Sequence, residues 1–399
     1  MDDSTLQIAV IGAGPVGLAL ALQAARALPE SGVTLFDARA ADKDVSGDPR
    51  TLALSLGSVQ LLERLGAWRA ERAQPILEVH VSQQAPSMPA LWGSLFGEPC
   101  LRIRAIDEAV PLLGAVLSDG AIVAPLQQVW MAAQAAEPKR LRSRFGEPVA
   151  ALKNLERGVE VDAGIAERFD LAIVAEGGVF SDQVRKAVAH DYRQTAWVGR
   201  VGFDEASGQR ERGVAFERFT RHGPAALLPL KDGGAGLVWC VPSDDDPVRE
   251  LDDPQRVAVL NSIFHPAVGR IASIAPLKPF ALGLNAERTL TDGRTVRIGN
   301  AAQTLHPVAG QGLNLGLRDA FELVQALSRH NDVDAVLRRL EWQRGPDRWA
   351  MIAATDFLAR SFTWKLPGAG AARGLGIAAL QALGPVRSAL ARQMMFGSR

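Results

Sequence analysis

Hydrophobic and polar positions follow two different patterns along the chain. Residues 8–12 and 33–36 are short, mostly apolar runs rich in branched side chains, which is typical of strands buried on both faces. Between them, residues 18–28 are mostly leucine and alanine, over a length that fits a helix. Buried strands that alternate with helices predict a parallel, Rossmann-like sheet at the start of the chain.

The pattern changes between residues 196 and 284. Strand-like segments follow one another there with only turns between them, and Asp232-Gly233-Gly234 is a hairpin signal. Consecutive hairpins predict an antiparallel sheet, which one helix at residues 252–264 interrupts. The strand-like segments are residues 197–203, 213–219, 225–230 and 235–241.

Helical spacing returns in the last third of the chain. Apolar residues recur from Leu313 to Leu327 at intervals of three and four residues, as on one face of a helix. A helix is also expected at residues 333–344, with Arg338, Arg339 and Arg344 facing outward. Two further helices are expected at residues 107–117 and 348–363.

Together these patterns predict an α/β fold class: a Rossmann-like domain with an inserted antiparallel-sheet domain and a helical C-terminus. The first domain is expected in three parts, because the second interrupts it and also receives a short excursion. The expected boundaries are 1–75, 100–187 and 285–370 for the first domain, 76–99 for the excursion, 188–284 for the inserted domain and 371–399 for the tail.

The composition excludes some classes of function. The 399 residues carry 44 basic and 44 acidic side chains, so no bulk field favours nucleic acid. Cys100 and Cys240 lie far apart, and the six histidines are scattered, so we expect neither a metal site nor a disulfide framework. The chain begins with Asp2-Asp3, where a secretory signal would be basic, which favours a cytoplasmic location.

The tail carries a possible surface of its own: Val386, Leu390 and Met394 recur every four residues, with Arg387 and Arg392 among them. One interpretation is a helix packed on the body of the protein, as most apolar stripes are. The other is a basic amphipathic surface that contacts a membrane peripherally or binds a partner protein.

The first chemical motif is the sequence GAGPVG at residues 12–17, which lies between a predicted strand and a predicted helix. In this context Gly12 makes a tight turn, Gly14 lets backbone approach a pyrophosphate, and Gly17 packs helix on strand. Asp37, 20 residues beyond Gly17, can accept hydrogen bonds from an adenosine ribose. The alternative is a Rossmann-like half without a ligand.

A second glycine loop follows a short strand at residues 296–298. It contains Gly299-Asn300 and His306-Pro307, and Gly310-Gln311-Gly312 precedes the helix that starts at Leu313. A helix start suits an anion or an electron-rich ring edge, and glycines let a planar ligand lie against bare backbone. An ordinary strand–helix connection is the alternative.

Two such loops, about 290 residues apart, suit a cofactor with two ends. A nicotinamide dehydrogenase would not need the second loop, whereas FAD has ADP at one end and a redox ring at the other. The pattern therefore points to FAD. For Arg50, a contact to a cofactor phosphate and a solvated surface position remain open.

At these motifs the chain resembles the class A flavoprotein aromatic hydroxylases, and specifically the hydroxylases of ubiquinone biosynthesis. The residues that carry the resemblance are 12–17, 215–220, 223–229, 299–319 and 389–397. Within this group the chain is most similar to the 2-polyprenyl-6-methoxyphenol hydroxylases. The resemblance covers nearly the whole chain and implies a fold like that of p-hydroxybenzoate hydroxylase.

The resemblance also implies the chemistry: bound FAD, NAD(P)H as reductant, dioxygen, a prenylated phenol as substrate and a C4a-hydroperoxyflavin. It assigns the ADP half of FAD to Gly12, Gly14, Pro15, Gly17, Asp37 and Arg50. It assigns the flavin half to Gly299, Asn300, Pro307, Gly310, Gly312, Leu313 and Asn314. His306 is a candidate base by location, although a residue that merely shapes the loop fits equally well.

One stretch departs from the family pattern. Residues 175–181 read AEGGVFS, where the class has Asp-Gly followed by Ser and Arg, so the binding mode of the reductant is open. Phe216, Phe219, Leu228, Trp239 and Val241 could line a tunnel for the prenyl tail or belong to the core. The alternatives are hydroxylation of another ring carbon, a reductase of the same fold, and a non-catalytic FAD-binding subunit of a biosynthetic assembly.

Overall fold

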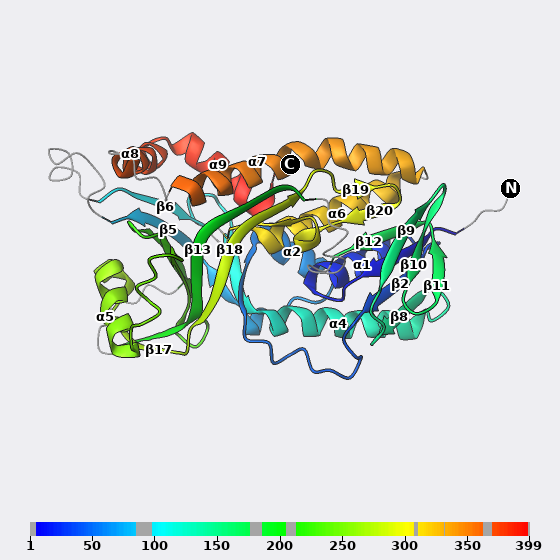
Figure 1. Ribbon diagram of the computed structural model, residues 1–399, viewed down its shortest axis with the longest axis horizontal. Helices are drawn as coiled ribbons and strands as arrows, with labels where there is room; N and C mark the ends of the chain where they lie inside the picture. Colours follow the sequence, from blue (N-terminus) through cyan, green and yellow to red (C-terminus); the bar gives the residue numbers. More distant parts are fainter. Residues whose placement is uncertain are drawn as a thin grey trace.

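The computed structural model describes residues 5–84, 98–175, 186–204, 213–306, 310–330, 332–361 and 369–397. A mostly parallel sheet lies at one end of the elongated molecule and a large, mostly antiparallel sheet at the other (Figure 1). Residues 85–97 of the excursion expected at 76–99 lie outside the described residues, as do the AEGGVFS stretch from residue 176 onward and Pro307.

The first sheet has six strands, and all its pairs are parallel except the one at the β19–β20 edge. Ile8 and Val10 of β1 point into a helical layer, whereas Ala9 and Ile11 point to the opposite face. In order, the strands are β19 (Thr291–Asp292), β20 (Thr295–Arg297), β12 (Leu171–Val174), β1 (Gln7–Ile11), β2 (Gly32–Asp37) and β8 (Leu141–Phe145).

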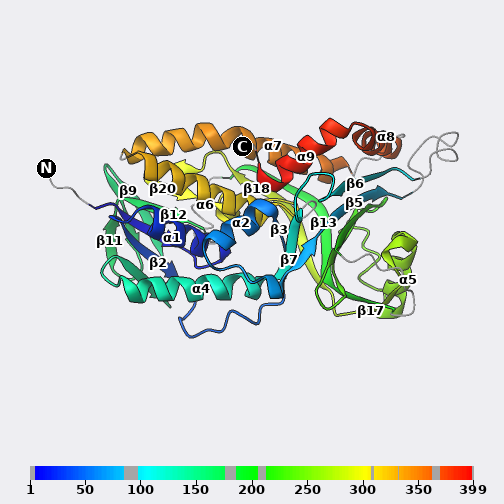
Figure 2. The same cartoon turned by 180° about the vertical axis from the view of Figure 1, so that it is seen from behind.

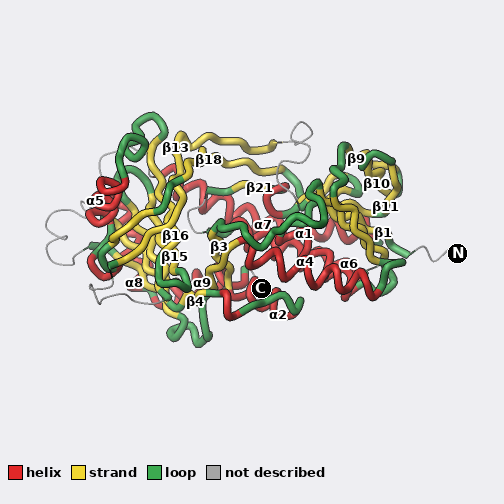
Figure 3. The backbone as a smooth tube through the Cα atoms, turned by 90° about the horizontal axis from the view of Figure 1, so that it is seen from below, coloured by secondary structure: helices red, strands yellow, loops and turns green. Residues whose placement is uncertain are grey.

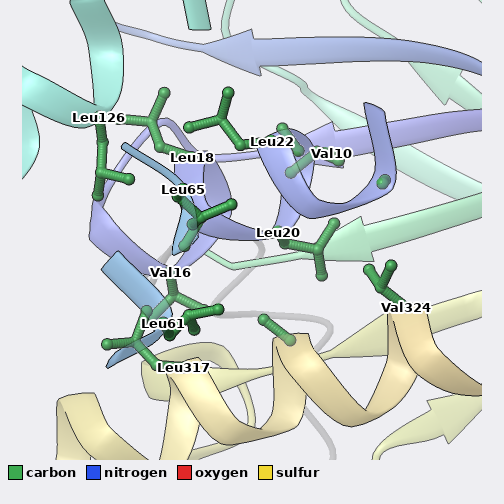
Figure 4. Close-up of a cluster of buried hydrophobic side chains, with 14 of the residues drawn as sticks. Val10, Val16, Leu18, Leu20, Leu22, Leu61, Leu65, Leu126, Leu317 and Val324 are labelled. Atoms are coloured by element: carbon green, nitrogen blue, oxygen red, sulfur yellow. The ribbon is translucent and has the colours of Figure 1, made fainter. Parts of the chain in front are cut away.

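Helices cover one face of this sheet and a small sheet covers the other. Figure 4 shows Leu18, Leu20 and Leu22 packed between neighbouring helices, with Leu126 and Leu317 approaching from two of them. The helices are α1 (Pro15–Ala27), α4 (Asp119–Ala136) and α6 (Gly312–Arg329). The small sheet consists of β9 (Ala151–Leu155), β10 (Gly158–Asp162) and β11 (Ala166–Phe169).

The second large sheet is antiparallel, as expected, apart from one parallel pair, β5 with β14. Its path also includes strands from before residue 105 in the chain. The order is β21 (Gln303–Thr304), β18 (Lys278–Glu287), β13 (Lys186–Phe203), β16 (Ala235–Pro242), β15 (Pro224–Pro229), β14 (Val214–Phe219), β5 (Glu78–Gln83) and β6 (Cys100–Arg104), with β17 (Ile271–Ile274) paired to β13.

One face of this sheet packs against α5 (Asp253–Ile263), which begins at the capping box of Asp252 and Gln255, close to the expected helix. The other face packs against three later helices. They are α7 (Val333–Ser361), α8 (Ala369–Ala382) and α9 (Gly384–Phe396). The tail therefore packs on the body: Ala391 and Met395 are buried and Leu390 is partly buried, although Val386 is 47% exposed.

A fourth sheet, of three strands, lies between the two large ones (Figures 2 and 3). It consists of β3 (Thr51–Ser55), β7 (Gly114–Ser118) and β4 (Gln74–Ile76), and α2 (Leu56–Arg64) follows β3. Short 3₁₀ turns occur at η1 (Ala70–Arg72), η4 (Pro266–Val268) and η5 (Gly299–Ala301). Arg50 directly precedes β3.

The helix predicted at residues 107–117 is wrong. Ala115, Val116 and Leu117 are buried in β7, between β3 and β4, and α4 begins only at Asp119 with Ser118 as its cap. The apolar run has no helical periodicity that could compete with burial on both sides of a strand. Pairing with strands distant in sequence decided the local structure.

The outward position predicted for Arg344 is also wrong. Residues 333–361 form one continuous helix, and Arg344 is only 4% exposed. Its Nε donates to Asp319 Oδ1 at 2.9 Å, and its Nη1 donates to Asp347 Oδ2 at 2.7 Å. Two carboxylates offset the desolvation of the guanidinium, so the side chain joins α6 to α7.

In the part of the chain that the structure describes, no helix combines the length and the apolar character that spanning a membrane requires. Cys100 and Cys240 are free thiols.

Candidate cofactor and substrate site

The two glycine loops face one cavity, of about 790 Å³. This volume lies in the upper part of the range for ligand sites, roughly 300–1,000 Å³. The cavity brings together these predicted residues: Gly14, Pro15, Asp37, Arg50, Gly299, Asn300, His306, Gly310, Gly312, Leu313 and Asn314. Gly12 and Gly17 lie behind its lining, where they shape the first loop.

The three glycines of the first loop meet three different physical demands. Gly12 has φ of +102°, which a residue with a side chain rarely adopts. A Cβ on Gly17 would overlap the carbonyl oxygen of Gly12, so Gly17 permits close packing of α1 on the loop. A Cβ on Gly14 would meet no atom within 4 Å, although Gly14 lines the cavity. That open space above bare backbone is what a bound pyrophosphate requires.

Asp37 ends β2 at the same edge of the sheet. Its carboxylate is buried and accepts hydrogen bonds from the Ala13 N–H at 2.6 Å and the Arg39 N–H at 2.7 Å. The Arg39 guanidinium also donates to this carboxylate, with Nε at 3.0 Å from Oδ1. Sequence reasoning missed Arg39, which lines the cavity; a basic residue two positions after the motif's acid was the available signal.

The second loop lies against the first, because a Cβ on Gly299 would be 3.4 Å from Val16 Cγ2. Gly299 and Gly310 have φ of +58° and +57°, in the region that favours glycine. Gly316, on the first turns of α6, was also missed: its Cβ would lie 2.7 Å from the Cα of Gly299. Because Gly316 has no side chain, the N-terminus of α6 can sit directly against this loop.

The start of α6 faces the cavity through Gly312 and Leu313. The first N–H groups of a helix have no partner within it and carry partial positive charge. Asn314 secures this helix start: its Oδ1 accepts from the Ser55 N–H and the Ser58 hydroxyl, both at 2.8 Å. Its amide also donates to the carbonyls of Ala53 and Gly310, so the side chain itself is fully engaged with protein.

Arg50 lies at an exposed part of the cavity lining. Its side chain is 69% exposed, and Nη2 lies 2.9 Å from Asp119 Oδ2 while Nε lies 3.0 Å from Asp48 Oδ1. The guanidinium is thus held at the cavity by Asp48 and Asp119, and these two carboxylates already balance its positive charge.

His306 is buried at the cavity wall, 2% exposed. The Gln194 amide nitrogen donates to the Ala359 carbonyl, so its oxygen faces His306, and His306 Nε2 is the donor of the 3.0 Å hydrogen bond between them. Burial lowers the pKa of His306 to about 4. The imidazole is therefore neutral near pH 7.

The opposite wall of the cavity is the face of β14, β15 and β16, with Met394 and Met395 of α9 beside it. Of the five apolar residues considered for a tunnel, Leu228 lines this wall. Phe216 borders the cavity, but its ring lies 5.5 Å from the His80 ring and packs in the core beneath α5. Phe219, Trp239 and Val241 belong to the core.

Comparisons with known proteins define the class. A family model described as an FAD binding domain matches residues 169–354. The Klebsiella pneumoniae protein HpxO, solved with FAD and uric acid, superposes with a TM-score of 0.74 at 17% identity, covering 98% of this chain and 97% of that one. A p-nitrophenol 4-monooxygenase from Pseudomonas putida gives 0.71 at 15% identity, covering 98% and 97%. The fold is that of FAD-dependent aromatic monooxygenases of the p-hydroxybenzoate hydroxylase type.

Relatives closer in sequence narrow the class. Ubiquinone hydroxylase UbiL of Rhodospirillum rubrum is 30% identical, over 98% of this chain and 90% of the relative. The 3-demethoxyubiquinol 3-hydroxylase of Escherichia coli is 28% identical, over 97% of both chains. The chain belongs to the FAD-dependent hydroxylases of ubiquinone biosynthesis, and it is accordingly a flavoprotein monooxygenase. NAD(P)H is the reductant typical of this family.

The residues present fit FAD. The open backbone at Gly14 can receive the pyrophosphate, and Asp37, which lines the same cavity, can accept a hydrogen bond from a ribose. The helix start at Gly312 offers N–H groups to a ring edge. Both features border the same cavity.

Proposed function

We propose that the protein hydroxylates the aromatic ring of a polyprenyl phenol in ubiquinone biosynthesis, as a 2-polyprenyl-6-methoxyphenol hydroxylase does, with NAD(P)H and O₂. The observation that carries this proposal is the shared cavity: both glycine loops and an apolar sheet face border it. A flavin and a largely apolar ring substrate could meet there.

In this proposal the loops divide the cofactor between them. Gly14, Pro15 and Asp37 would hold the ADP half, with Arg50 near a phosphate. Gly299, Asn300 and Gly310, together with Gly312, Leu313 and Asn314 at the start of α6, would hold the flavin half. When bound, FAD supplies activation of dioxygen for transfer of one oxygen atom to the ring. The N-terminus of α6 would stabilise negative charge on the ring system.

The sheet face would receive the substrate. Ile103, Ala215, Leu228 and Val238 offer apolar surface, and each buried CH₂ of a prenyl tail is worth roughly 0.8 kcal/mol. The same side chains would keep water from the reacting ring. For His306, a neutral imidazole with a pKa of about 4 is a weak proton acceptor, which favours a hydrogen-bonding role over that of a base.

We further propose peripheral contact with the cytoplasmic face of a membrane through α8 and α9. Leu375, Leu383 and Val386 are between 43% and 53% exposed, and Arg392 is exposed nearby. The same helices supply Met394 to the cavity, so a prenylated substrate could pass from lipid to the site. Co-sedimentation with anionic vesicles tests this: a Val386→Asp variant should bind less, and equal binding would contradict it.

The proposed function is tested with the purified, yellow protein and a short-chain prenylated phenol under ¹⁸O₂. Phenol-stimulated NAD(P)H oxidation with one labelled oxygen in the product is expected. Unlabelled product would indicate a reductase, and no turnover a non-catalytic subunit. Profiling of quinone intermediates in cells that lack the protein identifies the ring carbon that is hydroxylated, because the substrate of the missing step accumulates.

A further inference from the structure

The sheet face of the cavity contains one carboxyl group. Glu217 of β14 lines the cavity and is only partly exposed there. In the sheet it stands between Val81 of β5 and Ala226 of β15, and Val238 lies beyond Ala226 on β16. These neighbours are all apolar, so a hydrogen bond from any of their side chains is impossible.

Arginines donate hydrogen bonds to three buried carboxylates elsewhere in the described part of the chain, those of Asp37, Asp319 and Asp347. Glu217 Oε1 is buried and has no hydrogen-bond partner among the residues that the structure describes. A buried polar atom without a partner costs free energy, and because Glu217 lines the cavity, a ligand bound there can supply the partner.

The electrostatics agree with this geometry. Burial raises the pKa of Glu217 to about 7. Across the sheet, burial and then the Glu217 charge raise the pKa of the Cys240 thiol, which stays protonated. The carboxyl can therefore ionise slightly above neutral pH, where it becomes a strong hydrogen-bond acceptor.

We propose that Glu217 accepts a hydrogen bond from the ring hydroxyl of the substrate and so selects phenols over phenol ethers. This inference rests on the proposed function. On an otherwise apolar wall, one polar group fixes the orientation of a ring that carries one hydroxyl. The prenyl tail then extends along Val79, Ile103 and Leu228, and the hydroxyl determines which ring carbon faces the flavin. Glu217 thereby acts as a residue that determines specificity.

The experiment compares binding of a short-chain prenylated methoxyphenol with binding of its O-methyl ether, which lacks the hydroxyl donor. The FAD-loaded protein is titrated at about pH 8, where a carboxyl with a pKa of about 7 is ionised, and the flavin spectrum reports binding. Wild type should prefer the phenol roughly tenfold. Glu217→Leu should bind both compounds equally, with the affinity for the ether unchanged. The exposed Glu250→Gln is the matched control and should behave as wild type.

Glu217→Gln keeps an acceptor oxygen without the charge, so it should retain a preference of about threefold, because neutral hydrogen bonds are weaker than charged ones. If Glu217→Leu does not fold, the preference measured for Glu217→Gln tests the inference in its place. A tenfold preference in either variant would overturn the inference and leave the proposed function standing. If wild type binds neither compound, the proposed function itself fails. If wild type binds both equally, the inference alone fails.

Discussion

The cavity has two walls that are built in opposite ways. The loop wall consists of residues 14–16, 299–300, 305–306 and 310–314, and its glycines present bare backbone to the cavity beside the start of α6. The sheet wall consists of β14, β15 and β16 with Met394 and Met395, and it meets the cavity with side chains. The first suits a phosphate and a ring edge, and the second an apolar substrate.

This difference teaches which sites a sequence can reveal. A site that binds its ligand with backbone atoms needs positions without a Cβ, so glycines at fixed spacing in the sequence indicate it. A side-chain wall uses the same apolar residues as a core. In a strand, neighbouring residues face opposite sides, so on β16 Val238 reaches the cavity while Trp239 reaches the α5 core. Whether an apolar strand residue lines the cavity or belongs to the core depends on what its face packs against, which only the structure shows.

The largest effect is expected behind the loop wall. Gly17→Val would push a side chain into the Gly12 carbonyl and should lower the free energy of unfolding by about 3 kcal/mol. Urea unfolding measures it. In Gly376→Val no atom lies within 4 Å of the new Cβ, so this control should change stability by less than about 1 kcal/mol. Equal stability of both variants would refute the packing role of Gly17.

The next effect separates binding from folding. Gly14→Leu meets open space, so the fold should persist, but the side chain would occupy the place of the pyrophosphate. FAD affinity should fall at least about tenfold, as overpacking of ~1–3 kcal/mol implies. Flavin absorbance after gel filtration is the measurement. Full retention of FAD would remove the cofactor role of the first loop.

On the sheet wall the opposite result is expected. Leu228→Trp should weaken binding of the prenylated phenol by about 1 kcal/mol, roughly fivefold, and leave the FAD content unchanged. Ile165→Trp, at a position that is 71% exposed, controls for the added indole. Loss of FAD from Leu228→Trp, with phenol binding intact, would reverse the assignment of the two walls.

The smallest effect concerns Arg50. An exposed guanidinium that already pairs with Asp48 and Asp119 should add only about 0.2–1 kcal/mol to FAD binding. Arg50→Ala should therefore raise the FAD dissociation constant a few-fold and weaken its salt dependence. Arg249→Ala, at a similarly exposed arginine, is the control. Identical FAD binding in the two variants would make Arg50 a surface residue.

Local patterns predicted much of the fold correctly. The strands and helix around residues 12–17, the hairpins of the antiparallel sheet and the helix at Leu313 all correspond to structure. The errors have a common cause in long-range partners. Residues 114–118 form a strand because they pair with β3 and β4. Arg344 is buried because its guanidinium donates a hydrogen bond to Asp319. Neither partner is visible from the neighbouring sequence.

The site shows the same division. Both glycine loops were found by motif and context, and they do face one cavity. Gly316 was missed because its role depends on contact with Gly299, which the sequence around Gly316 does not show. Arg39 was missed because it lies just outside the motif, two positions after the motif's acid, Asp37. Glu217 lies in the stretch 215–220, which carries part of the family resemblance. The sequence does not show that its Oε1 is buried without a hydrogen-bond partner, because that depends on the residues around it in the fold.

A crystal structure of the FAD-loaded protein tests the central claim most directly. The account predicts density for one extended FAD in the cavity, with adenosine near Asp37, pyrophosphate over Gly14 and the flavin ring against the start of α6. Density that places the flavin ring away from Gly310 and Leu313, or the adenosine in another cavity, would contradict it.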